Sequence, residues 1–443
     1  MSDQQTSLSQ SDTAHAGGPA GTSDGRQAFG LSSSLRAILL TSPLLDELTF
    51  GILVLALPFM RDEFHLSYEQ TGFLFTVGSL SAMVIEPVIN LLSDRHSKRL
   101  FIVLGMLSLV MSFLLTSATS SYGMLLLAFA LIFPGIGIAL DLAQATLIDA
   151  APDASSHTMT RWTIMAGIGD LLAPLAVGII TAAGLSWRVL CLFAAALWGG
   201  AAATVWPQRF PKRPTLAQHD GEEDEGSIWK QLALAFTEGL QDKTLLRWAG
   251  VVLLCTMLDE VFLAFMGLYL RDALHATGWE IGLALGGLLG GGMVGLVILD
   301  RMHAWLRRRG SKMQSERLLL WLAVFTLVNI PIILIAHNIW IVTLALVFIG
   351  AGVAGWYPLA KASAYDLRPG RTGVVRAVIT IGSPFEMVLP TIVGIIAGHI
   401  GIAAGIAFLG LAPLGVLVLT PRRHGSSSVT AGGNNGSVDE GGV

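Results

Sequence analysis

The sequence has few charged residues for its length. Only 13% of its 443 residues are Asp, Glu, Lys or Arg, whereas 53% are hydrophobic and the mean hydropathy is +0.65. An ordinary soluble domain carries about a quarter charged residues. The composition therefore excludes a soluble globular protein and indicates a polytopic membrane protein. The net charge of -4 offers no general basic surface, so we expect no nucleic-acid partner.

Cysteines and catalytic motifs are equally scarce. Cys191 and Cys255 each stand alone in an apolar stretch, which excludes a disulfide framework and a cysteine metal site. The dense glycines between Gly282 and Gly295 are not followed by the Gly-Lys-Ser or Gly-Lys-Thr of a P-loop, and they indicate close helix packing instead. None of the ten histidines has the spacing of metal ligands or of a nucleophile and its base. We therefore expect no cofactor, no metal and no catalytic residue, and a membrane-embedded enzyme is disfavoured.

Long apolar runs are what the sequence does have. Each is long enough to cross a hydrocarbon core of about 30 Å as a helix, and helices are required because lipid cannot satisfy unpaired backbone groups. The predicted fold class is an all-α membrane protein with twelve transmembrane helices. The approximate spans are 37–60, 68–92, 99–118, 122–148, 158–183, 186–206, 246–270, 279–300, 316–336, 339–364, 373–397 and 400–420.

The polar segments divide the chain into parts. We expect disordered cytoplasmic tails at 1–33 and 421–443, six-helix bundles at 34–206 and 246–420, and a cytoplasmic linker at 207–245. Apolar residues at helical spacing within 228–241 predict an amphipathic helix in this linker, either on the membrane surface or packed under the bundle.

Basic residues set the orientation. Most of the 27 Lys and Arg fall in the tails and in the connections on one side, while Arg61, Arg188 and Arg271 fall on the other. By the positive-inside rule both termini are cytoplasmic, in an inner or plasma membrane.

The two halves repeat each other. Three charged pairs recur in the same order, and their positions are Asp46-Glu47, Arg61-Asp62 and Asp94-Arg95 in the first half and Asp259-Glu260, Arg271-Asp272 and Asp300-Arg301 in the second. Later in each half, Asp170 and Pro174 correspond to Glu386 and Pro390. Two related bundles facing one cavity suit a transporter, because a site at their seam can open to either side.

The chain resembles the major facilitator superfamily in its six-plus-six spans, long central loop and repeated Asp-Arg pairs. Asn90-Leu-Leu-Ser-Asp94-Arg95-His-Ser97-Lys98-Arg99 is similar to that family's loop signature, with Asn90 and Ser97 replacing two glycines. The resemblance implies two six-helix bundles and a cytoplasmic gate of Asp94, Arg95, Lys98, Arg99 and Arg376.

Two further family patterns are incomplete. The segment from Gly167 to Gly178 resembles the Gly-Pro-rich span 5 of the family's drug-efflux members, with Ala173 in place of a glycine, and it favours export. The arginine that many proton-driven members carry in span 4 is replaced by Leu131, so a relay through that arginine is excluded.

Acidic residues inside the spans are the best functional candidates, because a carboxylate at bilayer depth is costly unless it is paired, hydrated or protonated. Asp46 is the first choice as a proton carrier, and a purely structural role for these acids is the alternative. The acids predicted for proton coupling or the cavity are Asp46, Glu47, Glu86, Asp141, Asp170, Asp259, Glu260 and Glu386.

Span 10 contains the base Lys361, which falls opposite Gln144 of span 4 in the repeat alignment. It either pairs with an acid such as Asp141 or meets an anionic substrate. Nearby Trp356 and Tyr357 either stack on a solute or simply pack.

These features together predict a proton-coupled secondary active transporter that exports small amphipathic or cationic organic molecules by alternating access. The alternatives are a proton symporter for a small nutrient and a non-transporting membrane sensor. The expected partners are a small-molecule substrate, protons and the lipid bilayer, and a monomer is expected.

Overall fold

The computed structural model describes residues 31–95, 97–150, 155–208, 210, 241–308, 315–367 and 372–421. Twelve helical spans in this part are long and apolar enough to cross a membrane, and it contains no strand, as predicted. The predicted amphipathic helix at 228–241, and most of the tails and linker, lie outside the described residues. Each span of the N-terminal half is one helix. These helices are α1 (Ser33–Phe64), α2 (Tyr68–Arg95), α3 (Lys98–Ala118), α4 (Tyr122–Ala150), α5 (Ser155–Ala182) and α6 (Trp187–Val205).

Four spans of the C-terminal half are interrupted. The seventh is α8 (Lys243–Thr256) and α9 (Glu260–Asp272), the tenth is α12 (Ile339–Val353) and α13 (Trp356–Asp366), and the twelfth is α16 (Ile402–Leu409) and α17 (Ala412–Leu419). The eleventh consists of α14 (Thr372–Ile379), the 3-10 turn η2 (Thr380–Gly382) and α15 (Ser383–Ile400). Only α10 (Gly278–Arg308) and α11 (Ser315–Ile335) are continuous. The sequence predicted the spans but not these interruptions.

Proline does not explain the interruption of the seventh span. Pro43 and Pro58 lie inside α1, which remains one helix, whereas no proline occurs between Lys243 and Asp272. The break instead falls at Met257 to Asp259, and Asp259 has the non-helical angles φ -108° and ψ -128°. Irregular backbone at membrane depth is tolerated only where it is buried in protein or borders a cavity. The break therefore points to a polar space beside it.

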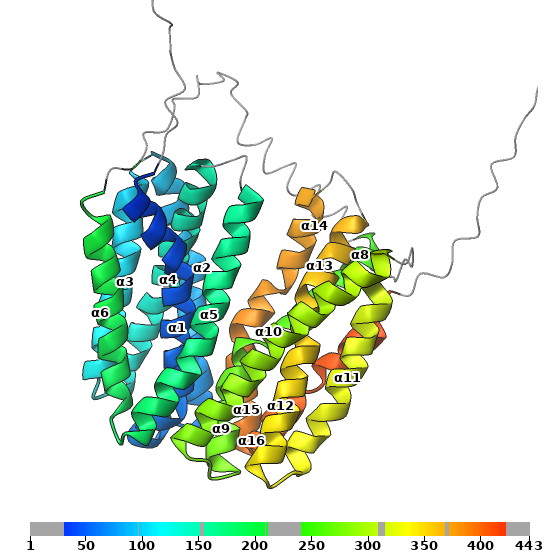
Figure 1. Ribbon diagram of the computed structural model, residues 1–443. Helices are drawn as coiled ribbons and strands as arrows, with labels where there is room; N and C mark the ends of the chain where they lie inside the picture. The colour runs from blue at the N-terminus through cyan, green and yellow to red at the C-terminus, as the bar shows by residue number, and fades with distance from the viewer. Residues whose placement is uncertain are drawn as a thin grey trace, which may run out of the picture.

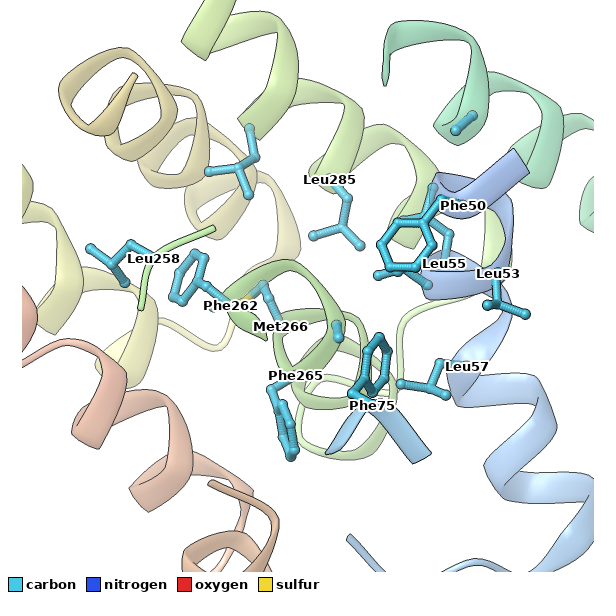
Figure 2. Close-up of a cluster of buried hydrophobic side chains, with 14 of the residues drawn as sticks. Phe50, Leu53, Leu55, Leu57, Phe75, Leu258, Phe262, Phe265, Met266 and Leu285 are labelled. Carbon is cyan, nitrogen blue, oxygen red and sulfur yellow. The ribbon is translucent and has the colours of Figure 1, made fainter. Parts of the chain in front are cut away.

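The two halves pack against each other through helices from both. Figure 1 shows two groups of helices that meet at one end and diverge towards the other. In Figure 2, apolar side chains of α1 and α2 face those of α9 and α10 across the seam, including Leu55, Phe75, Phe265 and Leu285. Leu55, Phe265 and Leu285 are completely buried. This apolar layer, which we call the seam core, excludes water between the halves.

The glycines of α10 act in helix packing, as the sequence indicated. A Cβ added at Gly291 would overlap the carbonyl oxygen of Val347, and one at Gly350 would overlap that of Leu288, so α10 and α12 touch through backbone. On its other face α10 approaches α5, where a Cβ at Gly282 would lie 2.8 Å from the Pro174 oxygen. Small residues at such positions let membrane helices approach closely.

We expect Gly350→Ala to destabilise the fold by about 1–3 kcal/mol, because a carbonyl oxygen cannot move aside as a flexible side chain can. Gly200 of α6 is the matched control, since an added Cβ there meets nothing within 4 Å. Thermal unfolding in detergent, followed by tryptophan fluorescence, measures both. Equal melting temperatures for Gly350→Ala and Gly200→Ala would contradict the close approach of α10 and α12.

Candidate functional site

The halves meet at the end of the molecule that carries the α1–α2 and α9–α10 connections, which we call the closed end. Here α2 and α15 touch through backbone, because a Cβ at Gly72 would overlap the Pro390 oxygen. The Thr76 hydroxyl lies 2.9 Å from the Met387 oxygen, to which it donates, and 2.8 Å from the Thr391 hydroxyl. Towards the opposite, open end, α2 and α15 no longer touch but line a cavity.

Two reciprocal ion pairs lock the closed end. Arg61 at the end of α1 donates to Asp272 at 2.7 Å, and Arg271 at the end of α9 donates to Asp62 at 3.1 Å. Asp272 also accepts from the Tyr68 hydroxyl at 2.5 Å. Each repeated Arg-Asp pair thus gives its arginine to the other half and receives one in return. These four residues form what we call the Arg–Asp latch.

A cavity of about 380 Å³ lies at the seam. Four carboxyl groups line it, and neither Lys nor Arg is among its lining residues. The rest of the wall is aromatic, aliphatic or hydroxyl-bearing. The lining residues are Phe75, Ser79, Ala82, Met83 and Glu86 of α2, Phe133 of α4, Thr256 of α8, Asp259, Glu260 and Val261 at the break, and Ser383, Glu386, Met387, Leu389 and Pro390 of α15. Such a space suits a positively charged solute with apolar parts.

The broken helices position three of the four acids. Asp259 occupies the break itself, and Glu260 lies in the first turn of α9. Glu386 lies in the first turn of α15, and its carboxylate accepts from the Thr256 hydroxyl at 3.2 Å. Helix N-termini stabilise nearby negative charge, so the start of α9 helps to hold carboxylates at bilayer depth. Because the helix stops here, both members of the Asp259-Glu260 pair line the cavity.

Glu86 comes from an unbroken helix. It lies within α2 directly before Pro87, and its carboxyl group packs against Gly137 of α4, where a Cβ would overlap it. Asp141 of α4 is close enough for the two charges to interact.

A second acidic group lies behind the cavity, in the N-terminal half. Glu47 of α1 and Asp170 of α5 come within hydrogen-bonding reach of each other. Gly169 allows this approach, since a Cβ there would lie 2.9 Å from that of Glu47. Asp46 interacts electrostatically with Asp170 and with Glu260, and within the described residues its buried Oδ1 has no hydrogen-bond partner. Asp46, Glu47 and Asp170 therefore form a group, here called the rear acids, that adjoins the cavity acids without lining the cavity.

The remaining predicted cavity residues lie elsewhere. Gln144 of α4 donates to the Met159 sulfur at 3.2 Å. Lys361 donates to the Tyr357 hydroxyl at 3.1 Å and does not pair with Asp141, the acid named as a candidate partner. Trp356 is completely buried, which supports the packing interpretation for it, while Tyr357 is exposed.

The predicted cytoplasmic gate stays a prediction. The side chains of Asp94 and Arg95 lie outside the described part of the chain. Lys98 pairs with Asp149 at 2.8 Å, and Arg99 donates to the Gln208 oxygen at 3.4 Å, so both contact their own half. Arg376 is exposed on α14.

Sequence reasoning missed the uncharged lining of the cavity. Phe75, Phe133 and Met387 resemble any apolar residue of a span, and only their position beside the acids distinguishes them. Thr256 lies three residues before Asp259, but its bond to Glu386 joins residues 130 positions apart in the chain. Sequence reasoning also missed the reciprocal pairing of the two Arg-Asp repeats, although it identified both copies.

Comparison with known proteins finds a family profile and relatives that match parts of this chain. The Major Facilitator Superfamily profile matches residues 39–313. The fosmidomycin resistance protein of Escherichia coli (strain K12) is 26% identical over 181 residues, which are 40% of this chain and 43% of that protein. Multidrug resistance protein 1 of Bacillus subtilis (strain 168) is 27% identical over 147 residues, 31% of this chain and 37% of that protein. The matched regions span less than half of either relative.

Solved structures share the fold at low sequence identity. A bacterial homologue of the human lysosomal transporter Spinster, inward-facing and unoccupied, superimposes with a TM-score of 0.69 at 14% identity, covering 90% of this chain and 98% of that one. The nucleoside transporter NupG superimposes with a TM-score of 0.65 at 12% identity, covering 87% and 97%.

We expect Asp272→Asn to separate the halves at the closed end, because it leaves Arg61 without its ion pair. A charged hydrogen bond contributes about 1.5–3 kcal/mol, so the ratio of separated to closed molecules should rise about tenfold or more. Spin labels at Leu185→Cys and His337→Cys, exposed loop positions in the two halves, report the distance once Cys191 and Cys255 are replaced by alanine.

Glu63→Gln provides the control for the latch. Glu63 pairs with Arg188 at 2.7 Å, the same distance as the Arg61–Asp272 pair, but within one half. The control should leave the distance between the labels unchanged. If the latch does not hold the halves together, both variants should give the same distance distribution.

Proposed function

The chain belongs to the Major Facilitator Superfamily, and on that premise we propose that it is a proton-coupled secondary active transporter exporting small amphipathic or cationic organic molecules. It is a multi-pass membrane transporter with twelve spans and not an enzyme. The proposal includes alternating access, in which the Arg–Asp latch and the seam core close one side while the cavity is reached from the other.

The observation that carries the substrate class is the cavity lining. Glu86, Asp259, Glu260 and Glu386 contribute four carboxyl groups from both halves, and no base balances them there. An organic cation would supply the missing positive charge, and its apolar parts would contact Phe75 and Phe133. Because both halves contribute acids, the solute would bridge them.

The arrangement of the rear acids supports proton coupling. Two carboxyl groups can hydrogen-bond only when one carries a proton, since an ionised carboxylate has no donor. The Glu47 and Asp170 pair is therefore a place to hold a proton. Like charges repel strongly in low-dielectric surroundings, so a cation bound beside Asp259 and Glu260 would allow the adjoining acids to release protons. Binding of the cation would thus be linked to release of protons, as an exchange of the two requires.

The names of the relatives support export. Two proteins similar to this chain are named for resistance, to fosmidomycin and to multiple drugs. With both termini cytoplasmic, as the basic residues predict, the open end faces the cytoplasm and the latch faces outward. A cavity reached from the cytoplasm is the loading state of an exporter, and a monomer in the inner or plasma membrane suffices for it.

Proton-driven uptake of a small anionic nutrient is the second candidate, and Lys361 favours it. Within the described residues its side chain contacts Tyr357 and no carboxylate. Solute accumulation in right-side-out vesicles with acid outside would favour uptake over export.

We expect Glu386→Gln to raise the KM for an organic cation such as tetraethylammonium about tenfold, the effect of removing one charge-assisted contact. Proton-driven uptake into inside-out proteoliposomes with an acid interior measures this. Glu280→Gln serves as control, because Glu280 caps α10 through Thr277 and glutamine can do the same. Unchanged KM in Glu386→Gln would exclude the cavity carboxyls as the cation site.

Asp170→Asn should uncouple transport of the solute from the proton gradient. We expect proton-driven accumulation to be lost while exchange of labelled for unlabelled solute continues, since asparagine cannot release a proton. Thr163→Ala, an exposed position on α5, is the control and should keep both activities. Full proton-driven accumulation by Asp170→Asn, with the wild-type pH dependence, would remove the rear acids from the coupling mechanism.

A further inference from the structure

A second cavity lies on the outside of the C-terminal half. It has a volume of about 530 Å³, and all of its lining residues are apolar. We call it the lateral groove. Its residues are Leu253, Leu254 and Met257 of α8 and the α8–α9 break, Phe385 of α15, and Phe408, Leu411, Ala412, Leu414, Gly415, Val418 and Leu419 of the α16–α17 span.

The lateral groove faces the hydrocarbon of the bilayer. Leu411, Leu414 and Val418 are 52%, 43% and 72% exposed. Because they belong to a membrane-spanning segment, the exposed surface faces lipid. Met257, at 5% exposure, forms part of the floor. An occupant must therefore come from the membrane and must present a hydrocarbon surface.

The groove and the polar cavity border the same two segments of the chain. On α8, Thr256 lines the cavity while its neighbour Met257 lines the groove. On α15, Glu386 lines the cavity while its neighbour Phe385 lines the groove. This shared wall consists of helix ends, because α8 stops at Thr256 and α15 begins at Ser383.

The negative charge at the shared wall indicates which molecules of the bilayer could occupy the groove. A molecule with its tail in the groove has its polar end next to the shared wall, where the Glu386 carboxylate accepts from Thr256. A phospholipid would bring a phosphate anion towards this carboxylate, which is repulsive. A cationic head is attracted.

We propose that the lateral groove binds the hydrocarbon tail of an amphipathic organic cation whose head lies at Glu386, so that substrate enters the cavity from the bilayer between α8 and α15. The inference rests on the proposed export of organic cations and adds a site for the tail and a route of entry. Lipid chains solvate a tail as well as the groove does. The groove therefore positions the molecule instead of extracting it.

Filling the groove should affect long cations and spare short ones. We would compare proton-driven transport of butyltrimethylammonium and octyltrimethylammonium by the full-length protein in proteoliposomes. Leu414→Trp places a bulky side chain in the groove. It should lower kcat/KM for the octyl compound several-fold, because the groove can no longer position the tail, and leave the butyl compound unchanged.

Leu344→Trp is the matched control. Leu344 is a lipid-facing leucine of α12 with 56% exposure, far from the groove residues in sequence and on another span. It should change neither substrate. The proposal is overturned if Leu414→Trp and Leu344→Trp affect the octyl compound equally, while wild-type transport of both compounds continues to support the proposed function.

A binding readout keeps the test independent of transport. Octyltrimethylammonium with a photoreactive tail, added to the full-length protein in nanodiscs, should label 253–257 and 411–419. Excess unlabelled compound should suppress this labelling, and Glu386→Gln should weaken it. Labelling of these segments that neither treatment reduces would show ordinary lipid exposure and overturn the proposal, whether or not the cations are transported.

Discussion

Lipid can neither hydrogen-bond a free backbone group nor solvate a charge, and this constraint governs where the chain can be irregular or acidic. Both occur together at the seam. The α8–α9 break places Asp259 and Glu260 beside the cavity, and the turn before α15 does the same for Glu386. The cavity supplies a polar border for the interrupted backbone, and the N-terminus of α9 favours the carboxylates beside it. The broken backbone and the cavity acids thus stabilise each other.

The duplicated halves have become unlike at this point. Asp46 and Glu47 lie on the unbroken helix α1 and form the rear acids with Asp170, whereas their counterparts line the cavity. In the function we propose, this difference divides the work between a group that holds protons and a group that meets the solute. The two groups remain electrostatically linked through Asp46 and Glu260, so occupancy of one affects the other.

The closed end combines three kinds of contact that act at different ranges. The seam core excludes water, the approach at Gly72 and Pro390 sets the spacing of α2 and α15, and the Arg–Asp latch adds directional attraction. Opening this end would expose the seam core to water, so the apolar layer favours the closed arrangement, while the ion pairs and glycine contacts fix its geometry. In the alternating access that we propose, these contacts define the state in which this end is closed.

The sequence by itself determined that the chain lies in a membrane, how many spans it has, and that its two halves repeat each other. Composition, the length of apolar runs and repeated charges can all be read along the chain. The sequence also identified Glu86, Asp259, Glu260 and Glu386 as cavity candidates, since acids in apolar spans are conspicuous. Only the tertiary structure decided which acids line the cavity, that Lys361 does not pair with Asp141, and that each Arg-Asp repeat binds the other copy. The break at Met257 was equally hidden, because no proline marks it, whereas Pro43 and Pro58 lie inside the unbroken helix α1. Such features depend on distances between residues remote in sequence, and these are fixed only when the helices pack.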